Sequence, residues 1–557
     1  MEQYVIIFFI ILFFAIMIFS QILNNKKRKK ALMETLKNIR GKHPEKRVDS
    51  ERWNHIGAYF KRSASGEHVD DITWNDLDMD DIYKRLDYTL SSSGEEYLYR
   101  LLRESFNKNI VDPDRLEKMV ARFKDDDDLR IRLSVILNDL GHSGKFSLWE
   151  YMDNLDYLGE RSNVSEYLLN LCFIILIALI PINPAVFTVL TVLFILYRII
   201  TYFRFKGEIE PYLISVRFLS ELVSSSDQMS NFDELKDFAD EELYKSLKTF
   251  SRIKKSASFL AKSGSNYSTS DFSEMFMDYI KMMTHVDIII FNNLLKKING
   301  NLEKIEKIYD FAGFLDAAIS VYLFRESIET YCIPKRGDFI KASQIYHPLL
   351  TDPVKNDITA EKSVLLTGSN ASGKSTFLKA VAVNVILAGA INTATAEEFF
   401  TPDFRIYSSM ALRDSIQDGK SFFVVEIGSL KRIYEGSLAS KRPVICFVDE
   451  VLRGTNTVER IAASTSVLQE FAENGIICFA ATHDIELTST LSGLFDNYHF
   501  EEFVEDGEVK FPYKLLEGPS VSRNALQLIG QFGFPENAVK KARKMVEQFN
   551  DKGIWNS

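Results

Sequence analysis

The sequence predicts a C-terminal α/β domain of the P-loop type, an α-helical middle region and membrane-spanning helices. Three observations predict this arrangement: a glycine-rich loop between an apolar strand and a helix, apolar strands that end in acidic residues or a histidine, and two long stretches almost free of charge. The composition is otherwise that of a globular chain, since 46% of the 557 residues are hydrophobic and 26% are charged. A wholly disordered or fibrous protein is therefore excluded.

The charge balance is acidic. The chain has 67 Lys and Arg residues against 77 Asp and Glu residues, a formal net charge of −10. It lacks the overall basic field of a dedicated nucleic-acid-coating protein, so any DNA contact needs a local basic patch. The four cysteines include no C-x-x-C pair, which argues against a disulfide framework and against a zinc site.

The first element is an uncharged apolar run over residues 4–23. At about 1.5 Å per residue, a helix of this length spans about 30 Å, the thickness of a bilayer core. The basic cluster 26–30 follows directly, which places the N-terminus outside and the following chain in the cytoplasm. A cleaved signal peptide is the alternative, but its positive charge would precede the apolar run. We expect residues 1–23 to be an uncleaved anchor.

Residues 24–75 form a basic juxtamembrane segment. Within it, residues 26–47 hold ten Lys and Arg residues against two Glu residues. Attraction to anionic lipid headgroups, at about 1 kcal/mol per basic residue near the surface, accounts for this charge. Binding to DNA phosphates is the alternative.

The second apolar region covers residues 168–203 and contains a single charged residue, Arg198. The sequence Pro-Ile-Asn-Pro at 181–184 divides it into two arms. Because backbone in lipid must hydrogen-bond to itself, we predict a transmembrane helical hairpin over residues 164–206. A buried hairpin of a soluble domain is the alternative. Residues 76–163 and 207–342 show helical periodicity and are predicted to form one helical domain that the hairpin interrupts.

The chemistry-bearing region begins with the apolar strand 363–367, followed by G-x-x-x-x-G-K-[ST] and a helix over 376–388. Glycines allow successive backbone N–H groups to approach phosphate, and the helix N-terminus adds its positive end. Lys374 is predicted to contact the β- and γ-phosphates and Ser375 to ligate Mg²⁺. The predicted ATP-binding residues are Gly368, Ser369, Asn370, Ala371, Ser372, Gly373, Lys374, Ser375 and Thr376.

Two downstream strands are expected to supply the other groups. The apolar run 444–449 ends in Asp449, which would hold Mg²⁺, and Glu450, which would orient or deprotonate the attacking water. The run 475–481 leads to His483, which would sense the γ-phosphate; a satisfied core histidine is the alternative. The predicted catalytic residues are thus Lys374, Glu450 and His483, the metal ligands are Ser375 and Asp449, and the cofactors are ATP and Mg²⁺.

These segments resemble the ATPase domain of the MutS family of DNA mismatch-repair proteins. The resemblance rests on residues 368–376, 449–457 and 481–483, although Val451-Leu452 replaces the family's Leu-Gly. Residues 419–426 are similar to the family's Ser-x-Phe-x-x-Glu segment. The resemblance implies that its serine, Ser421, completes the ATP site of the opposite protomer.

The resemblance extends from about Ser343 to Phe549. It includes a His-Pro segment at 345–350, a Tyr-Lys-Leu-x-x-Gly segment at 512–518, and two short helices over 524–548 that the resemblance assigns to dimerisation; a DNA-reading helix-turn-helix is the alternative. The family's mismatch-reading Phe-x-Glu wedge is missing, since no such triplet occurs before Phe232.

The resemblance implies an α/β P-loop NTPase domain of the ABC and MutS type over residues 343–557, with a lever-like helical region before it. We expect a multi-pass protein of the cell (inner or plasma) membrane with a cytoplasmic ATPase domain. It would act as an ATP-dependent homodimeric switch that binds DNA in a repair-related process. The alternative is a nucleotide-switched membrane scaffold with an unknown protein partner and no DNA binding. An ABC transporter is disfavoured because no Leu-Ser-Gly-Gly signature occurs.

Overall fold

The computed structural model describes residues 20, 23–44, 50–64, 66–107, 110, 112–154, 162–261, 272–298, 300–369, 372–410, 422–453, 455–505, 508–520 and 534–552. The chain divides into two compact units that do not follow chain order. The first comprises Met1–Ala64, Leu86–Arg100 and Asp114–Ser327, and the second comprises Ser65–Arg85, Leu101–Pro113 and Ile328–Ser557. The predicted boundary at residue 343 therefore differs from the observed one, because the second unit also includes segments that lie far upstream in the sequence.

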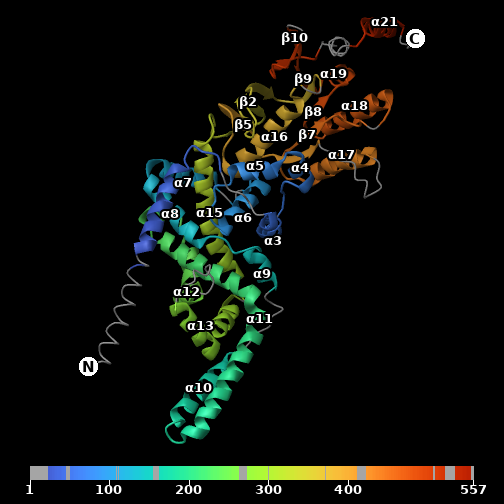
Figure 1. The fold of residues 1–557 in the computed structure, drawn as a ribbon. Helices are drawn as coiled ribbons and strands as arrows, with labels where there is room; N and C mark the ends of the chain where they lie inside the picture. Colours follow the sequence, from blue (N-terminus) through green and yellow to red (C-terminus); the bar gives the residue numbers. More distant parts are fainter. Residues whose placement is uncertain are drawn as a thin grey trace. The chain divides into compact units, whose positions relative to one another are not determined.

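The described part of the first unit is helical (Figure 1). Its central helix, α15 (Leu302–Glu326), is buried along most of its length, including the segment around Gly313. A Cβ at Gly94 would lie 2.2 Å from Asp316 Oδ2, so α6 and α15 approach closely there. The other helices of this unit are 23–38, α2 (Ser50–Trp53), α3 (Ala58–Ser63), α6 (Ser92–Arg103), α7 (Pro113–Asp125), α8 (Asp127–Leu140), α9 (Leu148–Asn154), η2 (Asp233–Leu235), α12 (Glu241–Ala261), α13 (Phe272–Thr284) and α14 (Val286–Ile298).

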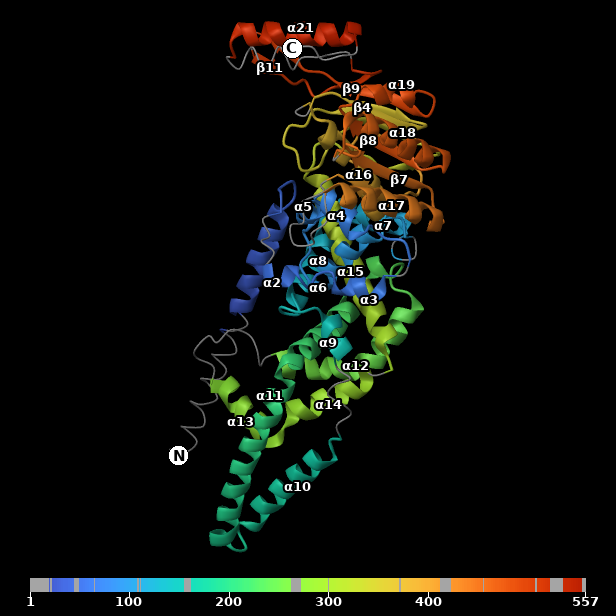
Figure 2. The same cartoon turned by 90° about the vertical axis from the view of Figure 1, so that its right-hand side faces the viewer.

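The predicted helical hairpin consists of α10 (Val164–Leu179) and α11 (Pro184–Ser230), whose arms lie side by side (Figures 1 and 2). The Asn183 side chain accepts a hydrogen bond from the Val186 N–H, and Pro184 occupies the first turn, so the sequence at the bend starts α11. The return arm is longer than the predicted hairpin, because α11 runs on to Ser230 as one helix.

Two helices of the described chain are long and apolar enough to cross a membrane. In Pro184–Gly207 only 17% of the apolar window is buried, whereas Lys374–Ile391 is 78% buried and is a core helix. The first arm, Val164–Leu179, is shorter. The anchor predicted over residues 1–23 lies outside the described residues, apart from Ser20 and Leu23.

The second unit contains, within its described residues, a six-stranded sheet of order β12-β9-β4-β8-β7-β6. All neighbours are parallel except β12 and β9, which are antiparallel. Sheets of four strands (β1-β5-β2-β3) and two strands (β10-β11) accompany it. The strands are β1 (Lys335–Arg336), β2 (Ile340–Ile345), β3 (Asn356–Ala360), β4 (Ser363–Thr367), β5 (Glu398–Thr401), β6 (Arg405–Ser409), β7 (Val444–Asp449), β8 (Ile477–Thr482), β9 (Phe495–Phe500), β10 (Phe503–Glu505), β11 (Glu508–Lys510) and β12 (Leu515–Glu517).

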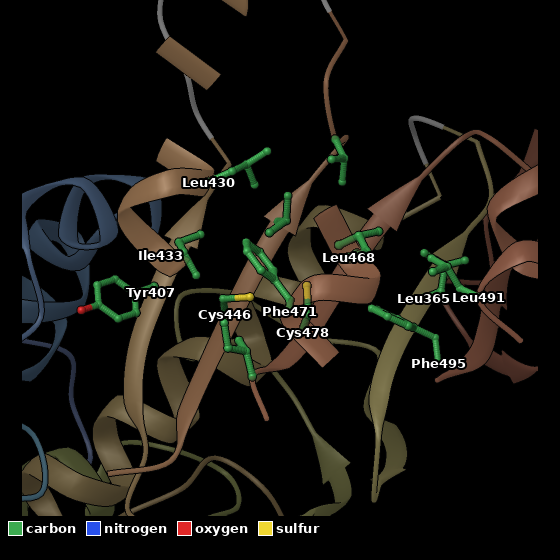
Figure 3. Close-up of a cluster of buried hydrophobic side chains, with 14 of the residues drawn as sticks. Leu365, Tyr407, Leu430, Ile433, Cys446, Leu468, Phe471, Cys478, Leu491 and Phe495 are labelled. Carbon is green, nitrogen blue, oxygen red and sulfur yellow. The ribbon is translucent and has the colours of Figure 1, made fainter. Parts of the chain in front are cut away.

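Apolar side chains of β7 and β8 fill the core between the large sheet and its helices (Figure 3). Cys446 and Cys478 lie opposite each other in the two strands, are free thiols and are fully buried. They act as small apolar residues of the core. The helices of the described part of this unit are α16 (Lys374–Ile391), α17 (Phe422–Ala439), α18 (Thr457–Glu473), α19 (Glu486–Thr490) and α21 (Glu536–Lys552), together with α4 (Asp71–Asp76) and α5 (Met79–Leu86) from the upstream segment.

Helix α4 covers the edge strand β6. The Asp76 carboxylate accepts hydrogen bonds from Ser408 Oγ at 2.7 Å and from the Met410 N–H at 2.9 Å, and Thr73 Oγ1 accepts from the Ser408 N–H at 3.0 Å. Unpaired N–H groups of an edge strand are thereby satisfied. The upstream segment is thus an integral part of the second unit.

Candidate nucleotide-binding site

The glycine-rich loop connects β4 to α16 and needs its glycines. Gly368 has φ +138°, and a Cβ there would lie 2.5 Å from the Phe500 carbonyl oxygen. Gly373 has φ +102°, and a Cβ there would lie 3.1 Å from the Tyr513 ring. Both positions combine a left-handed backbone with close contacts, which only glycine tolerates. The loop therefore holds its backbone close to the N-terminus of α16.

Lys374 is the first residue of α16 and is buried. Its Nζ donates to the carbonyl oxygens of Gly368 at 2.8 Å and Ser369 at 2.7 Å. Burial lowers the pKa of the Lys374 ammonium to about 8, while the charges of Asp449 and Glu450 oppose this shift. The ammonium therefore lies over the loop, within the electrostatic influence of the acidic pair.

Strand register brings the acidic pair and the histidine to one edge of the sheet. Asp449 and Leu366 both lie opposite Ala481 of β8, so the carboxyl ends of β4, β8 and β7 are level. Glu450 follows with φ +58°, and its N–H donates to the Ala481 carbonyl at 2.9 Å. This is the edge at which ligands bind in parallel α/β sheets.

Both oxygens of the Glu450 carboxylate have partners. Oε1 lies 3.0 Å from His483 Nε2, and Oε2 forms an ion pair with Arg453 Nε. The His483 side chain is 36% exposed, so it is not the buried core histidine that was the alternative. Nearby, Asp484 holds Arg460 through two hydrogen bonds of 2.6 and 2.8 Å.

A cavity of about 450 Å³ opens beside the loop. Ser375 and Thr376 of α16 line it, as do His347 of the predicted His-Pro segment and the ring of Tyr513. Burial, together with the nearby Lys379 charge, lowers the pKa of His347 to about 4, so this imidazole is neutral at pH 7.

Three of the predicted site residues lie outside the described part of the chain, and two residues that contact the site were not predicted. Asn370, Ala371 and Ser421 lie outside the described residues. Glu502, which accepts a hydrogen bond from Ser369 Oγ at 2.7 Å, was not predicted, and neither was Glu426 as a contact of the loop after β7. The Ser-x-Phe-x-x-Glu pattern contains Glu426, but nothing local indicates which distant residue it touches.

The donor set fits a polyphosphate with a magnesium ion. Left-handed glycines, a buried ammonium and a helix N-terminus form a cradle for phosphate. The hydroxyl of Ser375 and the carboxylate of Asp449 are oxygen donors of the kind Mg²⁺ prefers. No group of three or more His, Cys, Asp or Glu residues that could hold a metal by themselves occurs among the described residues.

Comparison with known proteins identifies this domain. Residues 364–550 match MutS domain V. The second unit thus contains a MutS domain V. The chain is 31% identical over 222 residues to the DNA mismatch repair protein MutS of Thermus aquaticus, and 32% identical over 209 residues to that of Pseudothermotoga lettingae. It is also 30% identical over 187 residues to the DNA mismatch repair protein MutS 2 of Haloarcula marismortui.

These similarities cover part of each MutS protein. The aligned region is 39% of this chain and 27% of the T. aquaticus protein, and it is 33% of this chain and 19% of the H. marismortui protein. The family match therefore identifies residues 364–550, within the second unit, as a MutS-type α/β domain. The first unit, with its helical hairpin, lies outside the residues that match the family model.

Proposed function

We propose that this MutS-family chain is an ATP hydrolase that works as an ATP-dependent conformational switch. The observation that carries the proposal is the position of Glu450, which His483 and Arg453 hold at the carboxyl edge of the sheet that also carries the glycine-rich loop. A carboxylate at this position beside a phosphate cradle suits the orientation of an attacking water.

Each residue then has a distinct role. Lys374 exchanges its two loop carbonyls for phosphate oxygens, and its positive charge offsets the negative charge that develops during phosphoryl transfer. Glu450 orients and accepts a proton from the water, and His483 fixes one of its oxygens. Ser375 and Asp449 would hold Mg²⁺, which when bound supplies positive charge to the β- and γ-phosphate oxygens. The cavity beside Tyr513 has the size for the nucleoside.

Turnover of ATP by the purified chain tests this proposal. Wild type should hydrolyse ATP in the presence of Mg²⁺, and Lys374→Ala should not. Equal turnover by the two proteins would contradict the proposed site.

We also propose DNA binding in a repair-related process and assembly as a homodimer. The support is the MutS domain itself and the relatives named above, which are all called DNA mismatch repair proteins. The alternative, a nucleotide-switched scaffold that never binds DNA, receives no support from these comparisons. A DNA titration at several salt concentrations decides between them, since phosphate contacts make affinity fall steeply with salt. An absence of binding at low salt would remove the DNA proposal.

Finally, we propose that the α10–α11 hairpin spans the cell membrane, with the ATPase domain on the cytoplasmic side. Large apolar side chains on both arms are exposed to the surroundings, for example Ile174 at 62% and Ile200 at 69%. The only charged residue of the apolar region, Arg198, is 1% exposed and points inward. It pairs with Glu166 at 2.7 Å and donates to the Met283 carbonyl at 2.9 Å. The charge is therefore removed from the apolar surface.

Cys172 provides a native probe of this insertion, because it lies exposed on α10 and is a free thiol. A charged maleimide should leave Cys172 unmodified in intact membranes and modify it after denaturation in detergent. The measurement uses a background with Cys332→Ser, Cys446→Ala and Cys478→Ala, so that Cys172 is the remaining native thiol, and a cysteine introduced at the exposed Glu435 serves as the reactive control. Equal labelling of Cys172 and the control in intact membranes would contradict insertion.

A further inference from the structure

A buried carboxylate from another element contacts the loop that carries Glu450. Glu426 lies in the first turns of α17 and is 3% exposed. Its Oε1 accepts a hydrogen bond from the Leu452 N–H at 2.5 Å. Its carboxylate therefore acts on the segment after β7.

The contacted loop has an unusual backbone. Glu450 has φ +58° and Leu452 has φ +59°, although neither is glycine. The left-handed conformation costs roughly 1–2 kcal/mol for each such residue. A contact that fixes the Leu452 backbone therefore offsets a conformational cost within this chain.

Two contacts hold Leu452 in this conformation. Its side chain is 3% exposed and packs in the core cluster that includes Val451 and Leu468. Its N–H is fixed by Glu426. A hydrogen bond to a carboxylate is stronger than one to a neutral acceptor, so the charge of Glu426 suits this task.

The loop conformation determines what Glu450 can reach. Arg453 follows Leu452 directly and pairs with Glu450 Oε2, while His483 holds Oε1. A shift of the Leu452 backbone would therefore displace Arg453 and release one oxygen of Glu450. The hydrogen bond between Glu426 and Leu452 is thus linked to Glu450 through the next residue, Arg453.

Burial of the Glu426 carboxylate costs more free energy than a purely structural contact requires. Burying a carboxylate away from water is unfavourable, and Oε2 has no hydrogen-bond partner among the described residues. Burial raises the pKa of Glu426, and the backbone amides of Leu452 and Arg453 oppose that shift. An apolar residue would pack there without these penalties, which points to a functional reason for the acid.

We infer that Glu426 is a positioning residue for ATP hydrolysis: it fixes the left-handed loop at Leu452 and thereby holds Arg453 against Glu450. This inference rests on the proposed ATPase activity. The proposed role places Glu426 on the loop after β7 and gives it no part in nucleotide binding. Its loss should therefore lower turnover and leave ATP binding nearly unchanged.

The test compares Glu426→Ala and Glu426→Gln with Glu435→Gln, a matched change at an exposed glutamate of the same helix that pairs with Lys431. Misplacement of a catalytic group by about 1 Å can lower the rate about 100-fold. We expect kcat to fall about 10- to 100-fold in Glu426→Ala, with the Kd for ATP within about threefold of wild type. Glu426→Gln keeps an oxygen acceptor, so its kcat should lie between those of Glu426→Ala and wild type. The kcat of Glu435→Gln should match that of wild type.

A double-mutant cycle shows whether Glu426 acts through Arg453. Arg453→Ala alone should lower kcat, and adding Glu426→Ala to it should lower kcat by less than about twofold more, because residues acting through one contact are not additive. If kcat of the double variant instead falls by the product of the two single-variant factors, the inference is overturned. If Glu426→Ala fails to fold in a thermal melt, Glu426→Gln, which preserves the side-chain shape, provides the same comparison.

The outcomes separate this inference from the proposed function. A wild-type protein without ATP turnover overturns both. Normal wild-type turnover that Lys374→Ala abolishes, together with unchanged kcat in both Glu426 variants, overturns only the role of Glu426. An equal loss of ATP binding and turnover in Glu426→Gln also overturns it, because that pattern indicates general damage to the site.

Discussion

His483 Nε2 lies 3.0 Å from Glu450 Oε1, although the two residues follow different strands. The contact exists because β7 and β8 are neighbours in register, with Asp449 opposite Ala481. Arg453 pairs with the other oxygen of the same carboxylate. Glu450 is thereby fixed in orientation, which is what the alignment of a water molecule requires.

Replacement of Glu450 by glutamine should separate binding from turnover. The amide keeps the shape of the side chain but is a far weaker base, so we expect ATP binding to persist while kcat falls by about 100-fold or more. A filter-binding assay for ATP and a phosphate-release assay measure the two quantities. Glu473→Gln, at the exposed end of α18, is the control and should leave both unchanged. Wild-type turnover in Glu450→Gln would refute the role given to this carboxylate.

Replacement of Lys374 by alanine should abolish ATP binding. The ammonium is the buried positive charge of the loop, and its removal leaves the phosphates without a partner inside the cradle. Fluorescence titration with a labelled ATP analogue measures the affinity. Lys431→Ala, at an exposed position of α17, should bind ATP as wild type does. Unchanged affinity in Lys374→Ala would place the nucleotide elsewhere.

The affinity for ATP should decrease at alkaline pH. Burial lowers the pKa of Lys374 to about 8. Below this pH the free protein already carries the charged ammonium, whereas above it ATP binding requires the uptake of a proton. The logarithm of the association constant should therefore fall by up to about one per pH unit above pH 8. In Lys374→Arg this dependence should disappear, because guanidinium keeps its charge; an identical pH profile in that variant would contradict the assignment.

Acid should destabilise the second unit through His347. Its pKa is lowered to about 4 in the folded protein from an ordinary value of 6.5. Because the unfolded chain then binds more protons, stability is fully present above pH 6.5 and is lost as the pH falls towards 4. The free energy of unfolding should fall by about 3 kcal/mol at most between these two pH values. Urea unfolding at pH 7 and pH 4.5 measures this fall in the free energy of unfolding. His347→Gln should show a smaller fall between the two pH values than wild type does. An equal fall in both proteins would exclude His347 as the cause.

The upstream helix α4 should stabilise the ATPase domain. Asp76 accepts hydrogen bonds from Ser408 and Met410 at the edge of the sheet, so Asp76→Ala leaves buried donors without a partner. We expect a loss of about 2–4 kcal/mol in the free energy of unfolding. The matched control is Asn75→Ala, at an exposed position of the same helix. Similar urea midpoints for the two variants would show that α4 contributes little.

Local sequence signals predicted those parts of the site that consist of consecutive residues along the chain. The strand 363–367, the glycine-rich loop and the strand 444–449 correspond to β4, the loop and β7 of the structure. The bend at 181–184 likewise predicted where α10 ends and α11 begins. These features are readable because short-range hydrogen bonding, glycine conformations and apolar periodicity depend only on neighbouring residues.

The sequence by itself determined the chemistry of the loop, the order of the strands along the chain and the presence of an apolar hairpin. Only the tertiary structure decided that residues 65–85 pack with the C-terminal domain, that Arg198 turns inward to Glu166, and that Glu426 holds the backbone of Leu452. Each of these contacts joins residues far apart in the chain. Their formation depends on which surfaces are buried together, a property of the packed molecule that no local pattern encodes.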